Sequence, residues 1–460
     1  MSNNKEPKGI SKSLKRFFGV GDFGFTLMSN IDTFYATYFF TNIAKFSLGV
    51  ITVMTTISAV VDAILSCLYG PFLNKVKPKK WGRYRSWLIL TPWMVPILYA
   101  MQFIKIGNGM AAVIFVTIAM ITSRIAWNIP FIANLSMINV AGKTPKDRMA
   151  LSSTRMVWTS LASVVYSYAG PAVVSVFVAF LGDKNAYAAT AFAFGVLMAA
   201  GYYAHFVMFK GYEMTGEEEN QMMEKKSTSS SKDKTGQKVS ALDAIKCNPH
   251  LLWLFLSSIT KYMVLFLVNG LAIYYFTYVS KNAALLATFV FAANLLGVLA
   301  SYISKFVVAK LTAKKTVLTA YILMAVFSVI AFLSYRQTWV ALVTMCLVMF
   351  MLVLTNACEP ELYSNCAQYS GKKLGYDVTG TVMGLLTVPL KIGIVTRGIL
   401  ISACLALANF SSEIDPSAAG EQLQRGISLG FMIVPAVVIL VGALLLAFGY
   451  RLKPAGTNEA

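Results

Sequence analysis

The chain has 460 residues, of which 57% are hydrophobic and only 13% are charged. Because a soluble domain carries about 25% charged residues, this composition excludes a water-soluble enzyme and predicts a membrane protein. The net charge of +20 is carried by short Lys and Arg clusters between apolar segments, which indicates contact with anionic lipid headgroups and excludes nucleic acid as a partner.

The apolar segments predict an all-α membrane protein of twelve transmembrane helices in two pseudo-symmetric six-helix bundles. A basic tail, residues 1–16, leads into the first span without a small-residue cleavage site, so no cleaved signal peptide is expected. The expected spans are 17–43, 48–74, 84–106, 109–140, 150–181, 188–210, 250–279, 283–309, 315–334, 338–366, 376–408 and 427–450. The expected domains are a bundle at 17–210, a cytoplasmic linker at 211–249, a bundle at 250–450 and a tail at 451–460.

Alternate loops hold most of the Lys and Arg residues, including the cluster from Lys75 to Arg85. The positive-inside rule therefore predicts that both termini are cytoplasmic in a multi-pass protein of the cell membrane. The linker contains a Ser- and Lys-rich stretch that is too polar to pack in a core. The segments YFFTNIAK, ending at Lys45, and YYFTYVSK, ending at Lys281, lie 236 residues apart, which predicts two halves related by a parallel repeat.

Ten of the ionisable residues inside the expected spans matter as candidates for a functional site. Such groups are costly in a bilayer and are expected to face a cavity or a partner. Five are acidic and five are basic, so a set of internal ion pairs is the alternative to a functional site, and Asp22 and Arg155 are close enough to the cytoplasm to snorkel. The ten residues are Asp22, Asp32, Asp62, Arg124, Arg155, Lys261, Glu359, Glu361, Lys391 and Arg397.

Asp62 lies one helical turn before Ser66 in the second span. A carboxylate beside a hydroxyl group can hold Na⁺ or take a proton, so Asp62 is predicted as the coupling site and the only candidate metal position. Lys391 in span eleven can neutralise this carboxylate when the cation is absent, or the two can form a permanent salt bridge. No cofactor other than the coupling cation, H⁺ or Na⁺, is expected.

The fourth span combines Arg124, Trp127, Asn128 and Asn134 with a helix-weakening Pro130. An aromatic ring beside guanidinium and amide hydrogen-bond donors is typical of a site that binds a sugar or another polar ring. The two histidines, His205 and His250, lie near span ends without metal-ligand company, and both are interpreted as interfacial residues.

These passages resemble the glycoside–pentoside–hexuronide:cation symporters of the major facilitator superfamily. The resemblance runs along most of the chain through FGVGDFGF, VVDAILSCLYGPFLNKVKPKKWGRYRSWLIL, WNIPF, AIYYFTYV and LKIG. WGRYRSW is its most specific part, although Ser86 replaces the family's proline. The resemblance implies a cytoplasmic gate formed by this loop and by the KDR segment, with Trp81, Gly82, Arg83, Arg85, Asp147 and Arg148.

The resemblance also implies roles for single residues. Asp62 matches the first carboxylate of the family's cation site, and Lys391 matches its functional lysine in span eleven. Ser66 stands where the family's best-known member has a second cation-site carboxylate, and Thr26 and Asn128 stand where it has two sugar-binding aspartates. Asp22 lies one turn before Thr26 and is expected to substitute. The expected substrate-binding residues are Asp22, Thr26, Arg124, Trp127, Asn128, Arg155, Lys261 and Lys391.

The expected function is secondary active import of a sugar, glycoside or hexuronide by symport with H⁺ or Na⁺, through alternating access of a monomer. The added cations Arg124, Lys261 and Arg397 suit an anionic substrate. One alternative is a facilitator or exporter of another small amphipathic or anionic solute on the same fold. The other alternative is a membrane enzyme or lipid transferase, but the sequence shows no convincing nucleophile–base arrangement for one. The chain also lacks a GxxxxGK[ST] phosphate loop for ATP.

Overall fold

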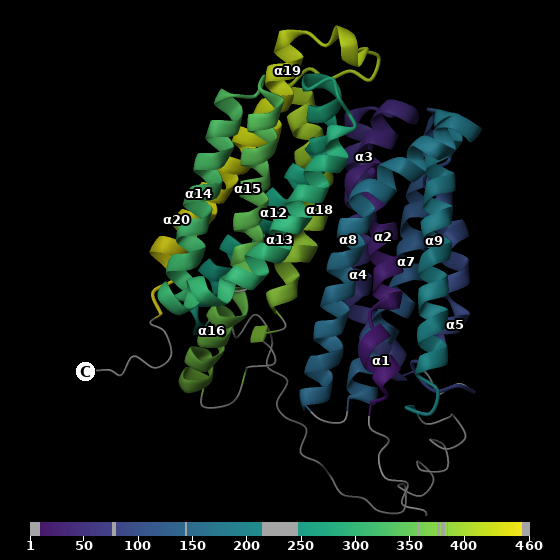
Figure 1. The fold of residues 1–460 in the computed structure, drawn as a ribbon, viewed down its shortest axis with the longest axis vertical. Coiled ribbons are helices and arrows are strands. Elements are labelled where there is room, and N and C mark those ends of the chain that lie inside the picture. The colour runs from purple at the N-terminus through teal and green to yellow at the C-terminus, as the bar shows by residue number, and fades with distance from the viewer. Residues whose placement is uncertain are drawn as a thin grey trace, which may run out of the picture. The chain divides into compact units, whose positions relative to one another are not determined.

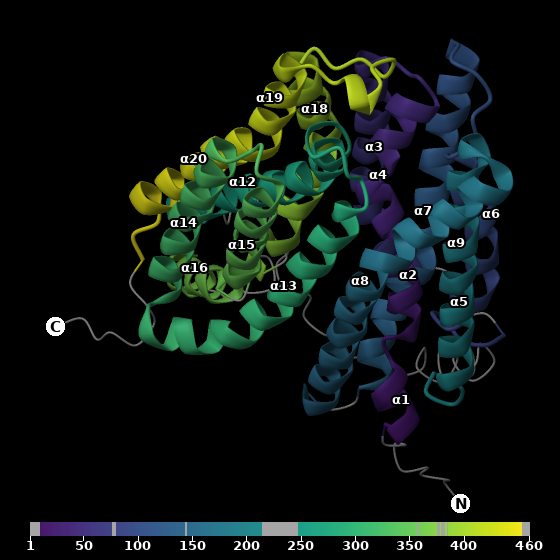
Figure 2. The ribbon, with the colours of Figure 1, turned by 45° about the horizontal axis from the view of Figure 1, so that its top comes forward.

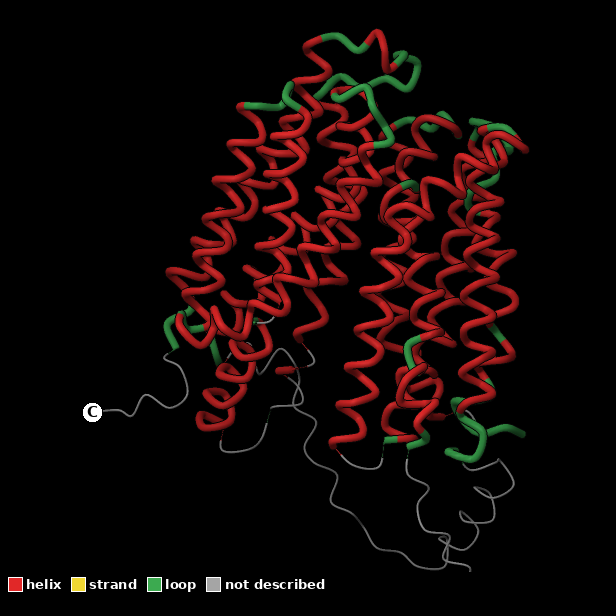
Figure 3. Tube along the Cα trace, in the orientation of Figure 1, coloured by secondary structure: helices red, strands yellow, loops and turns green. Residues whose placement is uncertain are grey.

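A computed structural model describes residues 10–75, 80–142, 145–213, 247–356, 358–374, 378, 382–383 and 385–452. All regular structure within these ranges is helical (Figure 1; Figure 3). Contacts divide the chain into two compact units. The N-terminal unit comprises Met1–Phe46 and Val53–Lys234, and the C-terminal unit comprises Ser47–Thr52 and Thr235–Ala460.

The N-terminal unit is a bundle in which α2 packs against α8 and α9, and α6 packs against α7 and α9. Its helices are α1 (Lys12–Phe17), α2 (Val20–Phe34), α3 (Ala36–Tyr38), the π-helix η1 (Phe39–Ile43), α4 (Leu48–Lys75), α5 (Trp87–Leu90), the 3₁₀-helix η2 (Pro92–Met94), α6 (Val95–Met101), α7 (Met110–Ala141), α8 (Pro145–Leu181) and α9 (Asp183–Met208).

The C-terminal unit places α12 against α18 and α20, and α14 against α15 and α20 (Figure 2). Its helices are α12 (Pro249–Tyr274), the π-helix η3 (Tyr275–Val279), α13 (Leu285–Lys310), α14 (Ala313–Leu333), α15 (Thr338–Asn356), α16 (Glu359–Leu374), η4 (Leu385–Thr387), α18 (Val388–Leu407), η5 (Pro416–Ala418), α19 (Glu421–Ser428), the π-helix η6 (Leu429–Ile433) and α20 (Val434–Gly449).

Ten helices within the described ranges are long and apolar enough to cross a membrane, and they correspond to expected spans two and four to twelve. The first and third expected spans are built from shorter pieces. The first consists of α2, α3 and η1, and the third is the apolar helical stretch Trp87–Met101. Pro92 and Pro96 explain the interruption of the third, because proline supplies no N–H for a helical hydrogen bond.

The internal repeat predicted from the sequence is confirmed in the backbone. The π-helices η1 and η3 begin 236 residues apart, at Phe39 and Tyr275. Each is followed by a lysine in the left-handed region, with a φ of 63° at Lys45 and 55° at Lys281. The next amide closes each helix end, with Phe46 N donating to Phe40 O and Asn282 N donating to Phe276 O, both at 2.9 Å. The two segments therefore share one unusual helix ending, as parallel repeats require.

Small residues let the first helix approach the sixth span closely. A Cβ atom added at Gly24 would lie 2.6 Å from the Cα atom of Met198, so only glycine fits at this crossing of α2 and α9. Pro130 lies inside α7, which the structure nevertheless continues as one helix from Met110 to Ala141. The effect of Pro130 on the span is therefore smaller than expected and is limited to the loss of a single backbone hydrogen bond.

Candidate functional site

The first polar cluster of the N-terminal unit surrounds Asp22 and joins α2, α7, α8 and α9. Arg155 Nε contacts Asp22 Oδ1 at 2.8 Å, and Asn134 Nδ2 donates to Asp22 Oδ2 at 3.0 Å. His205 Nδ1 lies 2.7 Å from Asn134 Oδ1, and Gly21 N donates to His205 Nε2 at 3.2 Å. We call Asp22, Asn134, Arg155 and His205 the Asp22 cluster.

The hydrogen bonds of the Asp22 cluster have a defined direction. The Gly21 N–H can only donate, so the geometry assigns His205 Nε2 as an acceptor and Nδ1–H as a donor. Asn134 then accepts through Oδ1 and donates through Nδ2 to Asp22. His205 is therefore a neutral, fully buried link, stacked on Phe18 at 5.6 Å, and its interpretation as an interfacial residue is wrong.

The second polar cluster joins α2, α4 and α7. Arg124 Nη2 lies 3.3 Å from Asp32 Oδ2, and Asn128 Nδ2 donates to Asp62 Oδ1 at 2.7 Å. The guanidinium of Arg124 lies 5.7 Å from the centre of the Trp127 ring. All five side chains are buried. We call Asp32, Asp62, Arg124, Trp127 and Asn128 the Arg124 cluster.

Helix α7 positions the side chains that organise both clusters. Arg124 and Asn128 are one turn apart, so they share a face, and Asn128 Nδ2 also donates to the Arg124 carbonyl at 2.9 Å. Asn134 lies further along the same helix and belongs to the Asp22 cluster. The expected substrate site therefore divides into two networks, in which Asp22 contacts Asn134 and Arg155 whereas Asn128 contacts Asp62.

Two expected site residues use their hydroxyl groups locally. Thr26 Oγ1 donates to the Asp22 carbonyl, and Ser66 Oγ donates to the Asp62 carbonyl, each at 2.7 Å and one turn back along its own helix. Both residues are half-buried. Their hydroxyl protons are used in these bonds, so each oxygen is left to act as an acceptor.

The expected lysines belong to the C-terminal unit. Lys391 lies half-buried in the first turn of α18, and its pairing with Asp62 remains a prediction. Lys261 is fully buried in α12 and contacts Glu359 Oε2 at 2.6 Å and Asn356 Oδ1 at 2.7 Å. The Lys261–Glu359 pair agrees with the alternative expectation that the charged residues in the spans form internal ion pairs. The Asp22–Arg155 and Asp32–Arg124 pairs agree with it as well.

The loop expected to form the cytoplasmic gate folds around the carboxylate of Glu213. Three consecutive amides donate to this carboxylate, from Arg83 at 3.0 Å, Tyr84 at 2.9 Å and Arg85 at 2.9 Å. Consecutive N–H groups of this kind form an anion-binding nest. Glu213 falls in the segment expected to be a linker, where no sequence pattern predicts a role for it.

Aromatic and cationic contacts attach the same loop to the end of α9. Arg85 Nε donates to the Phe206 carbonyl at 2.7 Å, its guanidinium lies 4.2 Å from the Phe206 ring centre, and Trp81 packs edge-on against that ring. Partial burial lowers the pKa of Arg85, and the Glu213 carboxylate acts in the opposite direction. Asp147 lies half-buried in the first turn of α8, and the side chain of Arg148 lies outside the described part of the chain.

We expect Gly82→Ala to destabilise the gate loop by about 1–3 kcal/mol. Gly82 has a φ of 114°, and a Cβ atom there would lie 2.5 Å from Glu213 Oε2. Thermal unfolding of the purified protein measures the effect. Gly49→Ala is the matched control, because a Cβ atom at Gly49 meets no atom within 4 Å. Equal midpoints for the two variants would contradict the expected role of Gly82.

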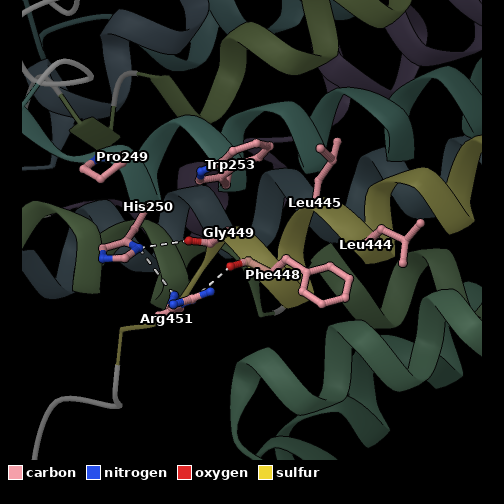
Figure 4. A pocket seen from close by; sticks show the side chains of 8 residues that line it. All are labelled: Pro249, His250, Trp253, Leu444, Leu445, Phe448, Gly449 and Arg451. Atoms are coloured by element: carbon pink, nitrogen blue, oxygen red, sulfur yellow. Dashed lines mark hydrogen bonds between the residues drawn. The ribbon is translucent and has the colours of Figure 1, made fainter.

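A groove of about 520 Å³ lies in the C-terminal unit, where α12 begins and α20 ends (Figure 4). Trp253, Leu444 and Phe448 give it an apolar lining, and His250 and Arg451 lie at one end. His250 Nδ1 lies 3.0 Å from the Gly449 carbonyl, so this histidine caps the end of α20. None of the expected substrate or coupling residues lines the groove.

Three residues in these networks have contacts that could not be predicted from the sequence, or that it signals only weakly. The burial of His205 could have been inferred from its position one turn after Gly201, on the face of α9 that packs closely against α2. Glu359 is named among the membrane charges, but its partner on a distant helix has no local signal. Glu213 has no signal either, because its nest is formed by backbone groups.

Comparisons with known proteins agree with this architecture. The family model described as MFS/sugar transport protein matches residues 17–453. The "Putative glycoside/cation symporter YagG" of Escherichia coli (strain K12) is 22% identical over 444 residues, which cover 95% of this chain and 91% of that protein.

Solved structures show the same fold at low sequence identity. The nucleoside transporter NupG has a TM-score of 0.64 at 11% identity, covering 96% of this chain and 100% of that chain. A bacterial homologue of the human lysosomal transporter Spinster, inward-facing and unoccupied, has a TM-score of 0.63 at 12% identity, covering 96% and 98%. The family match and the all-helical fold together show that this chain belongs to the MFS/sugar transport proteins of the glycoside–pentoside–hexuronide:cation symporter type.

Proposed function

We propose that this chain is a secondary active transporter that imports a sugar, a glycoside or a hexuronide together with H⁺ or Na⁺ by alternating access. The family match supports transport of a small solute across a bilayer, and the similarity to YagG, a putative glycoside/cation symporter, supports a glycoside and a cation. We further propose that the transporter works as a monomer in the cell membrane with both termini in the cytoplasm.

The Arg124 cluster carries this proposal. It places two carboxylates, a guanidinium, an amide and an indole on three helices of one membrane unit. Arg124 uses Nη2 for Asp32, whereas its buried Nε makes no hydrogen bond among the described residues. A buried donor of this kind needs a partner, and a sugar hydroxyl or ring oxygen supplies one.

The coupling role falls to Asp62 in this proposal. Its Oδ1 accepts a hydrogen bond from the Asn128 amide nitrogen, so coupling and substrate groups are joined by one contact of 2.7 Å. A Na⁺ ion at Asp62 would require an oxygen ligand, and therefore the amide oxygen of Asn128 in place of its nitrogen. The donor geometry supports H⁺ over Na⁺ as the coupling cation.

The charges bear on the substrate as well. Arg124 is paired with Asp32, and Lys261 is paired with Glu359, so neither side chain supplies an uncompensated positive charge. This pairing supports a neutral sugar or glycoside over an anionic hexuronide. Export or facilitated diffusion of another small amphipathic or anionic solute is the second candidate, because low-identity structural similarity establishes the fold and not the cargo.

We expect Asp62→Asn to abolish concentrative uptake while solute exchange continues, because an amide cannot take the coupling proton. The measurement uses proteoliposomes with a panel of neutral and acidic glycosides, first in counterflow to find the substrate. Uptake is then driven by a pH gradient or a Na⁺ gradient, each imposed separately. We expect the variant to exchange solute at no less than about half the wild-type rate. Its accumulation of solute should fall at least about tenfold, which corresponds to a loss of about 1.4 kcal/mol or more of coupling free energy.

Asp183→Asn is the matched control, because this exposed carboxylate at the start of α9 is outside both clusters. Full concentrative uptake by Asp62→Asn would remove Asp62 as the coupling residue. Uptake that depends on neither gradient in the wild type would instead favour facilitated diffusion. Preference for acidic glycosides would overturn the argument from charge pairing and leave symport intact.

A further inference from the structure

The C-terminal unit contains a buried cation that the transport proposal does not use. The ammonium of Lys261 on α12 contacts the last residue of α15, Asn356, and the first residue of α16, Glu359. It lies 2.6 Å from Glu359 Oε2 and 2.7 Å from Asn356 Oδ1. One side chain therefore connects the end of α15 with the beginning of α16.

The surroundings of Lys261 match those of a monovalent cation site. A carboxylate oxygen and an amide oxygen contact the ammonium directly, and its nitrogen lies 4.3 Å from the centre of the Tyr262 ring. Oxygen ligands and an aromatic face stabilise Na⁺, K⁺ or ammonium ions as well as a lysine.

Two further features show that the site has ligands to spare and an entrance. Lys261 is fully buried and Glu359 is 5% exposed, yet Glu359 Oε1 makes no hydrogen bond among the described residues. A closed structural ion pair would normally satisfy both carboxylate oxygens. Asn356 is exposed, so a small ion can reach this edge of the site.

We propose that the Lys261 ammonium is a tethered cation that permanently fills a monovalent-cation site formed by Glu359, Asn356 and Tyr262. The lysine replaces a free ion here, so the link from α12 to the Asn356 and Glu359 side chains persists at any external Na⁺ or K⁺ concentration. This site is separate from Asp62, which lies in the other unit, and it needs no transported substrate.

The test removes the tether and supplies a free cation. Lys261→Ala is purified in detergent, and its thermal unfolding is measured in choline, sodium, potassium, ammonium and methylammonium chloride at equal ionic strength. We expect its midpoint in choline to fall by about 5–10 °C, as for a buried charge that loses its partner. A small cation should recover at least half of this loss in a saturable way, and the wild type should respond equally to all five salts.

Two variants separate ion binding from a general salt effect. Lys261→Met fills the same space with an apolar chain, so no cation should rescue it. Lys261→Ala combined with Glu359→Gln removes the carboxylate, and the cation response should disappear. If Lys261→Ala cannot be purified, Lys261→Ser provides the same space with an added oxygen ligand, and its purification in ammonium chloride and in choline chloride gives the comparison.

The proposal is overturned if the small cations stabilise Lys261→Ala, or Lys261→Ser, no more than choline does. It is also overturned if the cation response persists without the Glu359 carboxylate. An uptake assay has no part in this measurement. The loss of the symport proposal would therefore leave the Lys261 site untouched, and the reverse also holds.

Discussion

Asp22→Asn is expected to lower the thermal unfolding midpoint of the transporter by about 4–10 °C, equivalent to roughly 2–3 kcal/mol. Asp22 is 1% exposed and accepts hydrogen bonds on two separate oxygens, from Arg155 and from Asn134. An asparagine offers one oxygen, so one of the two buried donors loses its partner. We place the effect below that of a fully buried pair, because the Arg155 side chain remains 20% exposed.

The hydrogen-bond direction in the Asp22 cluster makes repair costly. A flipped Asn134 amide requires the other His205 tautomer, in which the Phe17 carbonyl can accept from Nε2–H at 3.4 Å but the Gly21 N–H loses its acceptor. The rearrangement therefore moves the unsatisfied donor to Gly21 without removing it. The substitution is therefore expected to affect the whole network from α2 to α9.

Asp22→Asn combined with Arg155→Gln tests the same network with both charges removed. Because breaking a buried pair leaves an uncompensated charge, the double variant should recover at least about half of the lost stability. The scan is run in detergent beside an exposed acid-to-amide control at Asp183, which should remain within about 0.5 kcal/mol of wild type. A midpoint for Asp22→Asn within 1 °C of wild type, about the uncertainty of such a scan, would exclude the network as a stabilising element.

The helices and the repeat could be predicted from the sequence because both depend on local patterns. Apolar length gives the spans, and a repeated octapeptide at Lys45 and Lys281 is enough to place the shared helix ending. The interrupted first and third spans were predicted as continuous, because hydropathy is insensitive to breaks within an apolar segment.

The pairing of charged residues could not be predicted in the same way. A sequence gives the depth of Lys261 and of Glu359 in their spans, but not the rotation of α12 against α15 and α16 that brings them together. The Arg124–Asp32 and Arg155–Asp22 pairs depend on helix rotation in the same manner. His205 and Glu213 were missed because their partners are an amide on another helix and three backbone N–H groups.

The contact between Asn128 and Asp62 allows the proposed coupling role of Asp62 to be tested by changing one residue. The Asn128 amide donates to one oxygen of Asp62 at 2.7 Å and leaves the charge of that carboxylate unchanged. The resemblance to the symporter family implies a carboxylate where Asn128 now stands. The substitution back to that residue type is therefore informative.

Asn128→Asp is expected to make transport depend more strongly on Na⁺ or on low pH than the proposed symport of the wild type does. It would place two carboxylates at hydrogen-bond distance, and like charges that close cannot both remain ionised unless a proton or a metal ion lies between them. We expect uptake in choline at neutral pH to fall at least about tenfold, since a lost hydrogen bond to a charged group alone costs about 1.5–3 kcal/mol. Added Na⁺ or a lower pH should restore it.

Asn128→Ala separates the new charge from the lost amide. This variant removes the same hydrogen bond without adding a carboxylate, so its uptake should fall without a gain in cation dependence. Initial uptake rates in proteoliposomes over a matrix of Na⁺ concentration and pH distinguish the two variants. If Asn128→Asp and Asn128→Ala respond identically to both cations, Asn128 and Asp62 do not act as one site, and cation binding and substrate binding must be joined elsewhere in the Arg124 cluster.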